Sequence, residues 1–180
     1  MNIVEPIRSK RDIERIKKAL GNPRDRLLFI IGINSALRIS DILNLKVGDV
    51  RGKDAIVLKE KKTRKRKKFR INQAIHKAVK ELVPADAKDD EWLFPSRKGN
   101  KPITRVQAWR ILNDAAKRAG VDIEIGTHSL RKTFAYFAYK SGVDISLLMD
   151  ALNHSSQRET LRYIGITQEQ IDDVYISINL

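Results

Sequence analysis

The chain has 180 residues, 42% of them hydrophobic, which is enough apolar material for one folded domain or at most two small ones. Its 36 Lys and Arg against 22 Asp and Glu give a net charge of +14, a balance that indicates a polyanionic partner, most often nucleic acid. Disulfides and cysteine-ligated zinc are excluded because there is no cysteine. The longest apolar run, residues 27–33, is too short to span a bilayer, and no signal peptide is visible. We therefore expect a cytoplasmic, nucleoid-associated protein with no membrane partner.

The first 45 residues predict three helices. The first begins at a capping box, Ser9 to Asp12. The second begins at Pro23 and is apolar on nearly all sides, which predicts a buried central helix that ends near residues 34–37. Arg38 follows directly, and a short helix is expected over residues 40–45.

Residues 55–72 predict a β-hairpin with a basic turn. Residues 55–58 are strand-like, and eight of the ten residues from Lys61 to Arg70 are Lys or Arg. Such a run can be a solvated loop or a localisation signal, but at this density inside a folded domain it favours phosphate contact. The expected DNA contacts in the hairpin are Lys61, Arg64, Lys65 and Arg66.

The rest of the chain predicts mostly helices. They are expected over residues 73–83, 104–119, 127–141, 144–152, from Ser156, and from 167 into the tail. The helix from 104 carries Arg105 and Arg110, two further expected DNA contacts. The predicted fold class is α+β, a mostly helical domain over residues 1–180 with a small antiparallel sheet. We see no repeat, linker or domain boundary.

The stretch from Thr127 to Gly165 gathers the residues able to do chemistry. His128 and Arg131 are three positions apart, so on a helix they share a face, and Thr127 can cap that helix, where an anion would sit. His154 and Tyr163 follow nine residues apart. A fixed cation, two groups that titrate near pH 7 and a tyrosine hydroxyl suit phosphoryl transfer to a protein nucleophile.

An ordered set of six residues resembles the tyrosine recombinases, the phage integrase family. The set comprises Arg38 before Ser40-Asp41, Lys62 in a basic hairpin, His128-Ser-Leu-Arg131, His154 after Leu152-Asn153, and Tyr163. Each motif alone is weak, but the set is specific in order and spacing and covers nearly the whole chain. Asn153 stands where the family usually has glycine. The family also usually carries an N-terminal helical domain that clamps the other side of the DNA, so a chain without it is a minimal recombinase or an isolated catalytic domain.

The resemblance implies that Tyr163 attacks a DNA phosphodiester, leaving a 3′-phosphotyrosine and a free 5′-hydroxyl. Arg38 and Arg131 would hold the non-bridging oxygens, for which the planar guanidinium is suited. The other tyrosines fit other roles, since Tyr136 and Tyr139 resemble core aromatics and Tyr175 a docking residue on the tail helix.

Three further roles follow from the same resemblance. Lys62 would protonate the leaving 5′-oxygen, although Lys61 or Lys65 are alternatives for this acid. His128 would accept or relay the tyrosine proton, and His154 would hydrogen-bond the phosphate. No metal and no other cofactor is implied, because arginines neutralise the charge that metal ions neutralise in other nucleases.

Two rival functions remain open. A type IB topoisomerase-like enzyme would use the same residues to relax DNA, whereas a catalytically idle DNA-binding module should have lost one of the six. A metal-dependent nuclease is a poorer match, because His128, His154 and Asp150 have no familiar ligand spacing. The expected partners are double-stranded DNA and further copies of the chain in a tetramer on DNA. The tail, residues 167–180, would mediate assembly, and its packing in cis or in trans is open.

Overall fold

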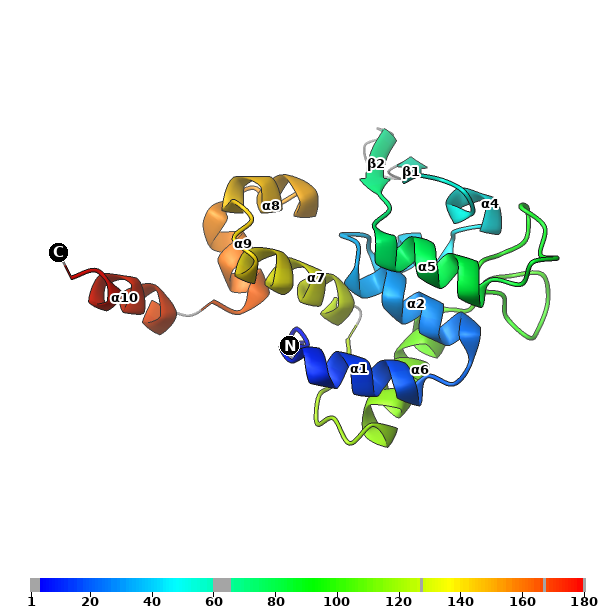
Figure 1. Ribbon diagram of the computed structural model, residues 1–180, viewed down its shortest axis with the longest axis horizontal. Helices are drawn as coiled ribbons and strands as arrows, with labels where there is room; N and C mark the ends of the chain where they lie inside the picture. The colour runs from blue at the N-terminus through cyan, green and yellow to red at the C-terminus, as the bar shows by residue number, and fades with distance from the viewer. Residues whose placement is uncertain (1–3, 60–65, 127, 167, 180) are drawn as a thin grey trace.

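The computed structural model describes residues 4–59, 66–126, 128–166 and 168–179. These residues form a mostly helical molecule with one two-stranded antiparallel sheet, which confirms the predicted fold class (Figure 1). The elements are α1 (Lys10–Ala19), α2 (Pro23–Ile33), α3 (Ile39–Leu43), α4 (Val47–Val50), β1 (Ala55–Lys59), β2 (Arg66–Arg70), α5 (Gln73–Leu82), α6 (Arg105–Arg118), α7 (Ser129–Lys140), α8 (Ile145–Leu152), α9 (Gln157–Ile164) and α10 (Gln168–Ser177).

Helix α2 is the centre of the molecule, as its uniformly apolar sequence predicts. The Asn22 side chain accepts a hydrogen bond from the Arg24 amide, and Pro23 occupies the first turn. The helix contacts α1, α3, α5, α6 and α7. Leu28, Phe29 and Ile31 are wholly buried because neighbours cover α2 on several sides.

The predicted hairpin is present. Its register pairs Ala55 with Arg70 and Lys59 with Arg66. Strand β2 begins at Arg66, and the basic segment at residues 60–65 lies outside the described residues. Ile56 is buried beneath the sheet, whereas Arg66, Lys68 and Arg70 are exposed. The sheet therefore presents a row of cations while it is anchored on the core.

Helices α7, α8 and α9 pack against one another beside α2 (Figure 1). A small hydrophobic cluster lies between them and consists of Ala36, Ala135, Leu148, Leu152 and Ile164. Ala36, Ala135, Leu152 and Ile164 each lie within four residues of a predicted site residue. This cluster therefore supports the helices that carry the candidate site.

Some predicted boundaries are wrong by a few residues. The helix expected over 127–141 is Ser129–Lys140, and its N-cap position is His128, which makes no side-chain capping bond. Thr127, the predicted cap, lies outside the described residues. The helix expected over 40–45 covers Ile39–Leu43, and α4 was not predicted because a four-residue helix has no apolar periodicity.

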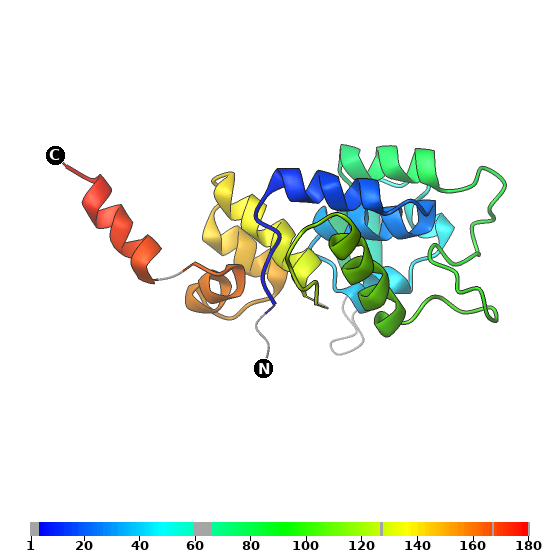
Figure 2. The ribbon, with the colours of Figure 1, turned by 90° about the horizontal axis from the view of Figure 1, so that it is seen from below.

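The tail forms a helix, α10, as predicted. Figures 1 and 2 show it standing away from the other helices. Val174, Tyr175, Ile176 and Ile178 are exposed by 58%, 78%, 78% and 63% respectively. Four apolar side chains of the described part of the tail are therefore largely exposed. Within the described ranges, no helix is both long and apolar enough to cross a membrane.

Candidate active site

Five of the six predicted catalytic residues lie at or near the ends of α3, α7, α8 and α9. Arg38 occupies the N-cap position of α3, so it is not a cation capping the end of α2, where Asn34 is the C-cap. His128 and Arg131 belong to the first turn of α7. His154 follows α8, and Tyr163 lies in the last turn of α9. Arg38, Arg131, His154 and Tyr163 each lie within four residues of a member of the buried cluster.

Arg131 is the most buried of these residues, with only 7% of its surface exposed. Its Nη2 donates a 2.6 Å hydrogen bond to the carbonyl oxygen of Leu152, which joins α7 to the end of α8. Its buried Nε has no hydrogen-bond partner among the described residues. A buried guanidinium with an unused donor is costly, and an anion would satisfy it.

Tyr163 and His154 are in direct contact. Their ring centroids are 4.9 Å apart and their planes are inclined by 75°, an edge-to-face arrangement. The Nδ1 atom of His154 is 2.9 Å from the Thr160 Oγ1, which orients the imidazole. The Tyr163 hydroxyl is buried and, within the described part of the chain, has no hydrogen-bond partner.

His128 lies in a strongly cationic field. Burial lowers its pKa below the ordinary value of 6.5, and the charges of Arg131, Lys132, Arg38 and Arg105 lower it further. Its imidazole is therefore neutral at neutral pH and able to accept a proton. These charge interactions also show that Arg38 and Arg105 lie near enough to act on the start of α7.

The pKa shifts of Tyr163 and His154 indicate that the two residues share one electrostatic environment. Burial raises the pKa of the Tyr163 phenol, while Arg131 and Arg38 oppose this shift by favouring the phenolate. Burial also lowers the pKa of His154, and the same two arginines lower it further, against Glu159. Two guanidinium groups thus act on both the tyrosine and the histidine, as expected of groups around one site.

The predicted DNA contacts are only partly placed. Three of them, Lys61, Arg64 and Lys65, lie outside the described residues, and so does Lys62. The general acid predicted among Lys61, Lys62 and Lys65 therefore also lies there. Arg66 begins β2 and is exposed. Arg105, also exposed, acts on His128, whereas Arg110 lines a separate pocket of about 440 Å³ with Arg24, Arg97 and Lys98. Arg105 therefore belongs to the surroundings of the site, and Arg110 faces elsewhere.

Sequence reasoning missed two residues that support the site. Thr160 orients His154, and its position four residues after Ser156 gave no distinguishing signal. Lys132 places its Nζ 5.0 Å from the centroid of the Tyr163 ring. Its position directly after Arg131 was visible, but the tyrosine it meets is 31 residues further on in the chain, and no local pattern joins the two.

Known proteins share both the sequence and the fold. The family model described as "Phage integrase family" matches residues 9–170. The probable integrase/recombinase YoeC of Bacillus subtilis is 49% identical over 97% of both chains. The tyrosine recombinase XerA of Pyrococcus furiosus is 28% identical over 87% of this chain, which spans 55% of that protein, so the chain is about half as long as its Xer relatives.

Solved structures agree in fold. A crystal structure of XerA recombinase superposes with a TM-score of 0.79 at 20% identity, covering all of this chain and 66% of that one. The catalytic domain of bacteriophage HP1 integrase superposes with a TM-score of 0.63 at 21% identity, covering 97% and 95% of the two chains. Because the family model covers most of its length and a relative is 49% identical over 97% of both chains, the chain belongs to the phage integrase family, the tyrosine recombinases that break and rejoin DNA strands.

Proposed function

We propose that residues 1–180 form one catalytic domain that cleaves and rejoins double-stranded DNA through a 3′-phosphotyrosine on Tyr163. The observation that carries this proposal is a pair of buried polar atoms, the Tyr163 hydroxyl and the Arg131 Nε, which lack hydrogen-bond partners among the described residues. A phosphodiester between them would meet both a nucleophile and a cationic donor. Structures of related recombinases bound to DNA, such as XerH on its difH substrate, support DNA as the partner.

In the first step the Tyr163 oxygen attacks phosphorus and the bond to the 5′-oxygen breaks. Arg131 and Arg38 would hold the non-bridging oxygens, because both act electrostatically on the tyrosine. His128, whose pKa is lowered, would accept the phenol proton. His154 would donate to the phosphate from the ring nitrogen opposite the Thr160 contact.

The leaving 5′-oxygen needs a proton, which we assign to Lys62. This residue belongs to the basic segment between β1 and β2 in the sequence. The phosphotyrosine stores the energy of the broken bond, so a 5′-hydroxyl can attack it and restore the DNA without ATP. The reverse step returns the protons along the same groups.

The test is to trap the protein on a nicked suicide DNA in the presence of EDTA and to identify the modified residue by mass spectrometry. We expect an adduct at Tyr163. Tyr163→Phe should form none while it binds DNA with unchanged affinity, because only the nucleophilic oxygen is lost. Tyr175→Phe, which removes an exposed tyrosine of the tail, is the matched control and should form the adduct normally. An adduct at Tyr175, or one that persists in Tyr163→Phe, contradicts the proposal.

A supercoiled plasmid and DNA with paired recombination sites distinguish a recombinase from a topoisomerase-like enzyme and from an idle binding module. A supercoiled plasmid that is relaxed but never yields recombinants would indicate topoisomerase-like activity. Absence of any adduct, with DNA binding intact, would indicate an idle binding module. Recombinant products from paired sites, together with the Tyr163 adduct, are expected of a recombinase.

We further propose that copies of the chain assemble on DNA as a tetramer by passing α10 to a neighbour. The exposed apolar residues of α10 support this, since such a surface is normally covered. Gly165 ends α9 with a φ of 79°, and α10 begins three residues later. The tail thus leaves the fold two residues after the nucleophile, and its docking would bear on where Tyr163 stands.

A further inference from the structure

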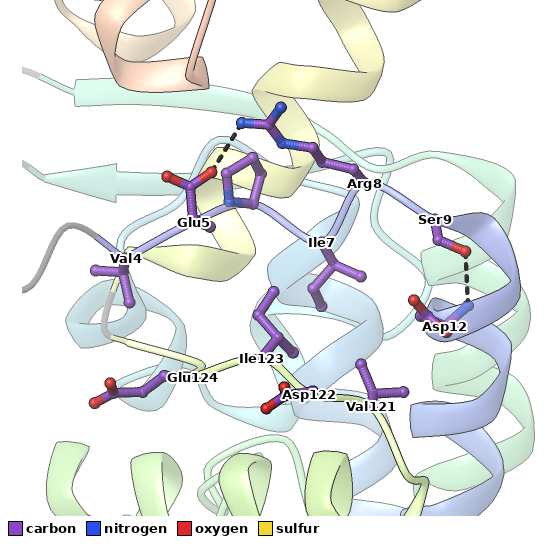
Figure 3. A pocket seen from close by; sticks show the side chains of 11 residues that line it. Val4, Glu5, Ile7, Arg8, Ser9, Asp12, Val121, Asp122, Ile123 and Glu124 are labelled. Carbon is purple, nitrogen blue, oxygen red and sulfur yellow. Dashed lines mark hydrogen bonds and ion pairs between the residues drawn. The ribbon is translucent and has the colours of Figure 1, made fainter.

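The segment before α1, residues 4–8, forms a strap across α7 (we call it the N-terminal strap). Figure 3 shows it running in an extended path into the start of α1. The amide of Ile7 donates a 2.9 Å hydrogen bond to Thr133 Oγ1, in a buried position. Ile7 is 1% exposed and belongs to the core formed by α1, α2 and α6. The strap is therefore an integral part of the fold at this point.

The strap is joined to the nucleophile through a single lysine. The Nζ of Lys132 donates a 2.9 Å hydrogen bond to the carbonyl oxygen of Val4, a residue 128 positions away in the chain. The same Nζ lies 5.0 Å from the centroid of the Tyr163 ring, within the range of a cation–π interaction. One partly buried ammonium group thus contacts both the strap and the tyrosine.

The two ends of the strap touch glycines on either side of the site. Val4 packs so closely on Gly126 that a Cβ there would lie 3.1 Å from the Val4 Cβ. A Cβ on Gly165 would lie 2.5 Å from Arg8 Nη2. Gly126 comes two residues before His128, and Gly165 two residues after Tyr163. The strap therefore contacts the chain beside both the base and the nucleophile.

One side of the strap borders a pocket. A pocket of about 460 Å³ lies between it and residues 121–124, which lead from α6 toward α7. In Figure 3, Ile7 and Ile123 point toward each other across this space. The strap is therefore held by the buried Ile7 side chain and by its contacts with Lys132, Thr133 and the two glycines.

We infer that Lys132 is a positioning residue, which the Val4 carbonyl holds over the ring of Tyr163 so that the tyrosine stands in line with the scissile phosphate. The inference rests on the proposed function of Tyr163 as nucleophile. The face of an aromatic ring is negative, so a fixed cation over it restrains how the ring can turn. His154 restrains the same ring through its edge-to-face contact. Attack on phosphorus requires such restraint, because a small misplacement of reacting atoms lowers the rate strongly.

A direct contact between Lys132 and DNA is the competing explanation. Lysine binds phosphates as a point charge, and Lys132 is only partly buried. The two roles differ in what they change. A phosphate contact alters DNA affinity and its salt dependence, whereas a positioning role alters the rate of attack in the bound complex.

The test measures DNA affinity by band shift, and the single-turnover rate of Tyr163 adduct formation on suicide DNA at saturating protein. Four variants of the full chain are compared with the wild type. Lys132→Met removes the charge, and Lys132→Gln removes the charge but keeps a donor for the Val4 carbonyl. Lys132→Arg keeps the cation, and Thr133→Val removes the acceptor of the Ile7 amide. Lys140→Met, an exposed lysine on the same helix, is the matched control.

We expect Lys132→Met and Lys132→Gln to slow adduct formation about tenfold, the effect of one cation–π contact of ordinary strength. Affinity for DNA should stay within about twofold. Lys132→Arg should restore most of the rate, because arginine also stacks on aromatic faces. Thr133→Val should slow the reaction about threefold by loosening the strap, and Lys140→Met should behave as the wild type.

Three results would overturn the inference. The first is an unchanged adduct rate in both Lys132→Met and Lys132→Gln. The second is a loss that Lys132→Arg does not rescue, which would indicate a packing role. The third is weaker binding with a flatter salt dependence and an unchanged rate at saturation, which would indicate a phosphate contact. If Lys132→Met fails to fold, Lys132→Gln and Thr133→Val still decide. Absence of a Tyr163 adduct in the wild type would instead contradict the proposed function.

Discussion

At the scale of single residues, Asn153 shows how the site tolerates a departure from the family pattern. It ends α8 in the left-handed region, with φ 58° and ψ 46°, where glycine is the usual residue and asparagine the common substitute. Leu152, the residue before it, accepts a hydrogen bond from Arg131 at its carbonyl oxygen, and His154 is the residue after it. The backbone at Asn153 therefore keeps the glycine geometry while it fixes two site residues.

We predict that Asn153→Gly leaves stability and adduct formation nearly unchanged. Asn153→Val should lower the free energy of unfolding by roughly 1–2 kcal/mol, because a β-branched side chain is strained at positive φ. It should also slow adduct formation, since the turn carries His154. Urea unfolding and the suicide-DNA assay measure the two effects. A valine variant as stable as the glycine variant would show that the turn does not need this conformation.

The lowered pKa values of two histidines predict how the free energy of unfolding depends on pH. Burial lowers the pKa of His154 and His128 below 6.5 in the folded chain. As the pH falls, the unfolded chain binds these protons first, so this contribution to stability is complete above about pH 6.5 and is lost as the pH falls through the lowered values. Urea unfolding at about pH 7.5 and pH 5 should show the loss. His154→Gln should make it smaller, and an equal loss in that variant would contradict the assignment.

At the scale of elements, α2 and α7, the helices next to the two arginines of the site, pack against each other. Arg38 follows α2 and Arg131 lies in α7. Gly32 on α2 accepts Leu130 so closely that a Cβ there would lie 3.0 Å from the Leu130 Cβ. We predict that Gly32→Ala lowers the free energy of unfolding by roughly 1–3 kcal/mol, because overpacking moves the helices apart.

Gly32→Ala should also slow adduct formation by more than its effect on DNA binding, since Arg131 moves with α7. Gly21→Ala is the matched control, because a Cβ at Gly21 meets nothing within 4 Å. Chemical denaturation and single-turnover kinetics of both variants give the comparison. If the two variants have the same stability and the same adduct rate, the contact between α2 and α7 can accommodate an extra methyl group.

The hairpin predicts how DNA binding depends on salt. Arg66 and Lys68 are exposed on β2 and extend the basic turn. Replacing both by Ala should flatten the slope of log K against log salt by about one to two units, with little change in sequence preference. The control replaces Lys77 and Lys80, two exposed lysines of α5. Titrations at several salt concentrations measure the slopes, and equal flattening in the control pair would reduce the effect to net charge.

At the scale of the whole molecule, α10 connects catalysis to assembly. We predict that deleting residues 168–180 weakens binding to DNA with two sites more than binding to DNA with one site. The apolar residues Tyr175 and Ile176, each 78% exposed, would lose their place on a neighbouring copy. The adduct rate should change as well, because the tail begins soon after Tyr163. Band-shift titrations on both DNAs decide, and equal losses would argue against passage of the tail to a neighbour.

Most of the fold was predictable because its signals are local. The apolar character of α2, the capping boxes, the hairpin and the order of residues from Arg38 to Tyr163 are all legible within short windows. The left-handed turn at Asn153 was not, since glycine and asparagine share that conformation only in context. The bond from Lys132 to Val4 was also out of reach, because it joins residues 128 positions apart. Long-range contacts of this kind depend on how the helices pack.

The close approach of Val4 to Gly126 provides a place for an engineered disulfide bond. The protein has no cysteine, so Val4→Cys with Gly126→Cys would introduce the only two thiols. Their Cβ atoms would be about 3.1 Å apart, slightly closer than the 3.5 Å or more of an ordinary disulfide, so a small outward shift of the strap would suffice. Oxidation would then lock the strap beside the start of α7, and a reductant would release it. Comparing adduct formation before and after the reductant is added would show whether the reaction requires the strap to move.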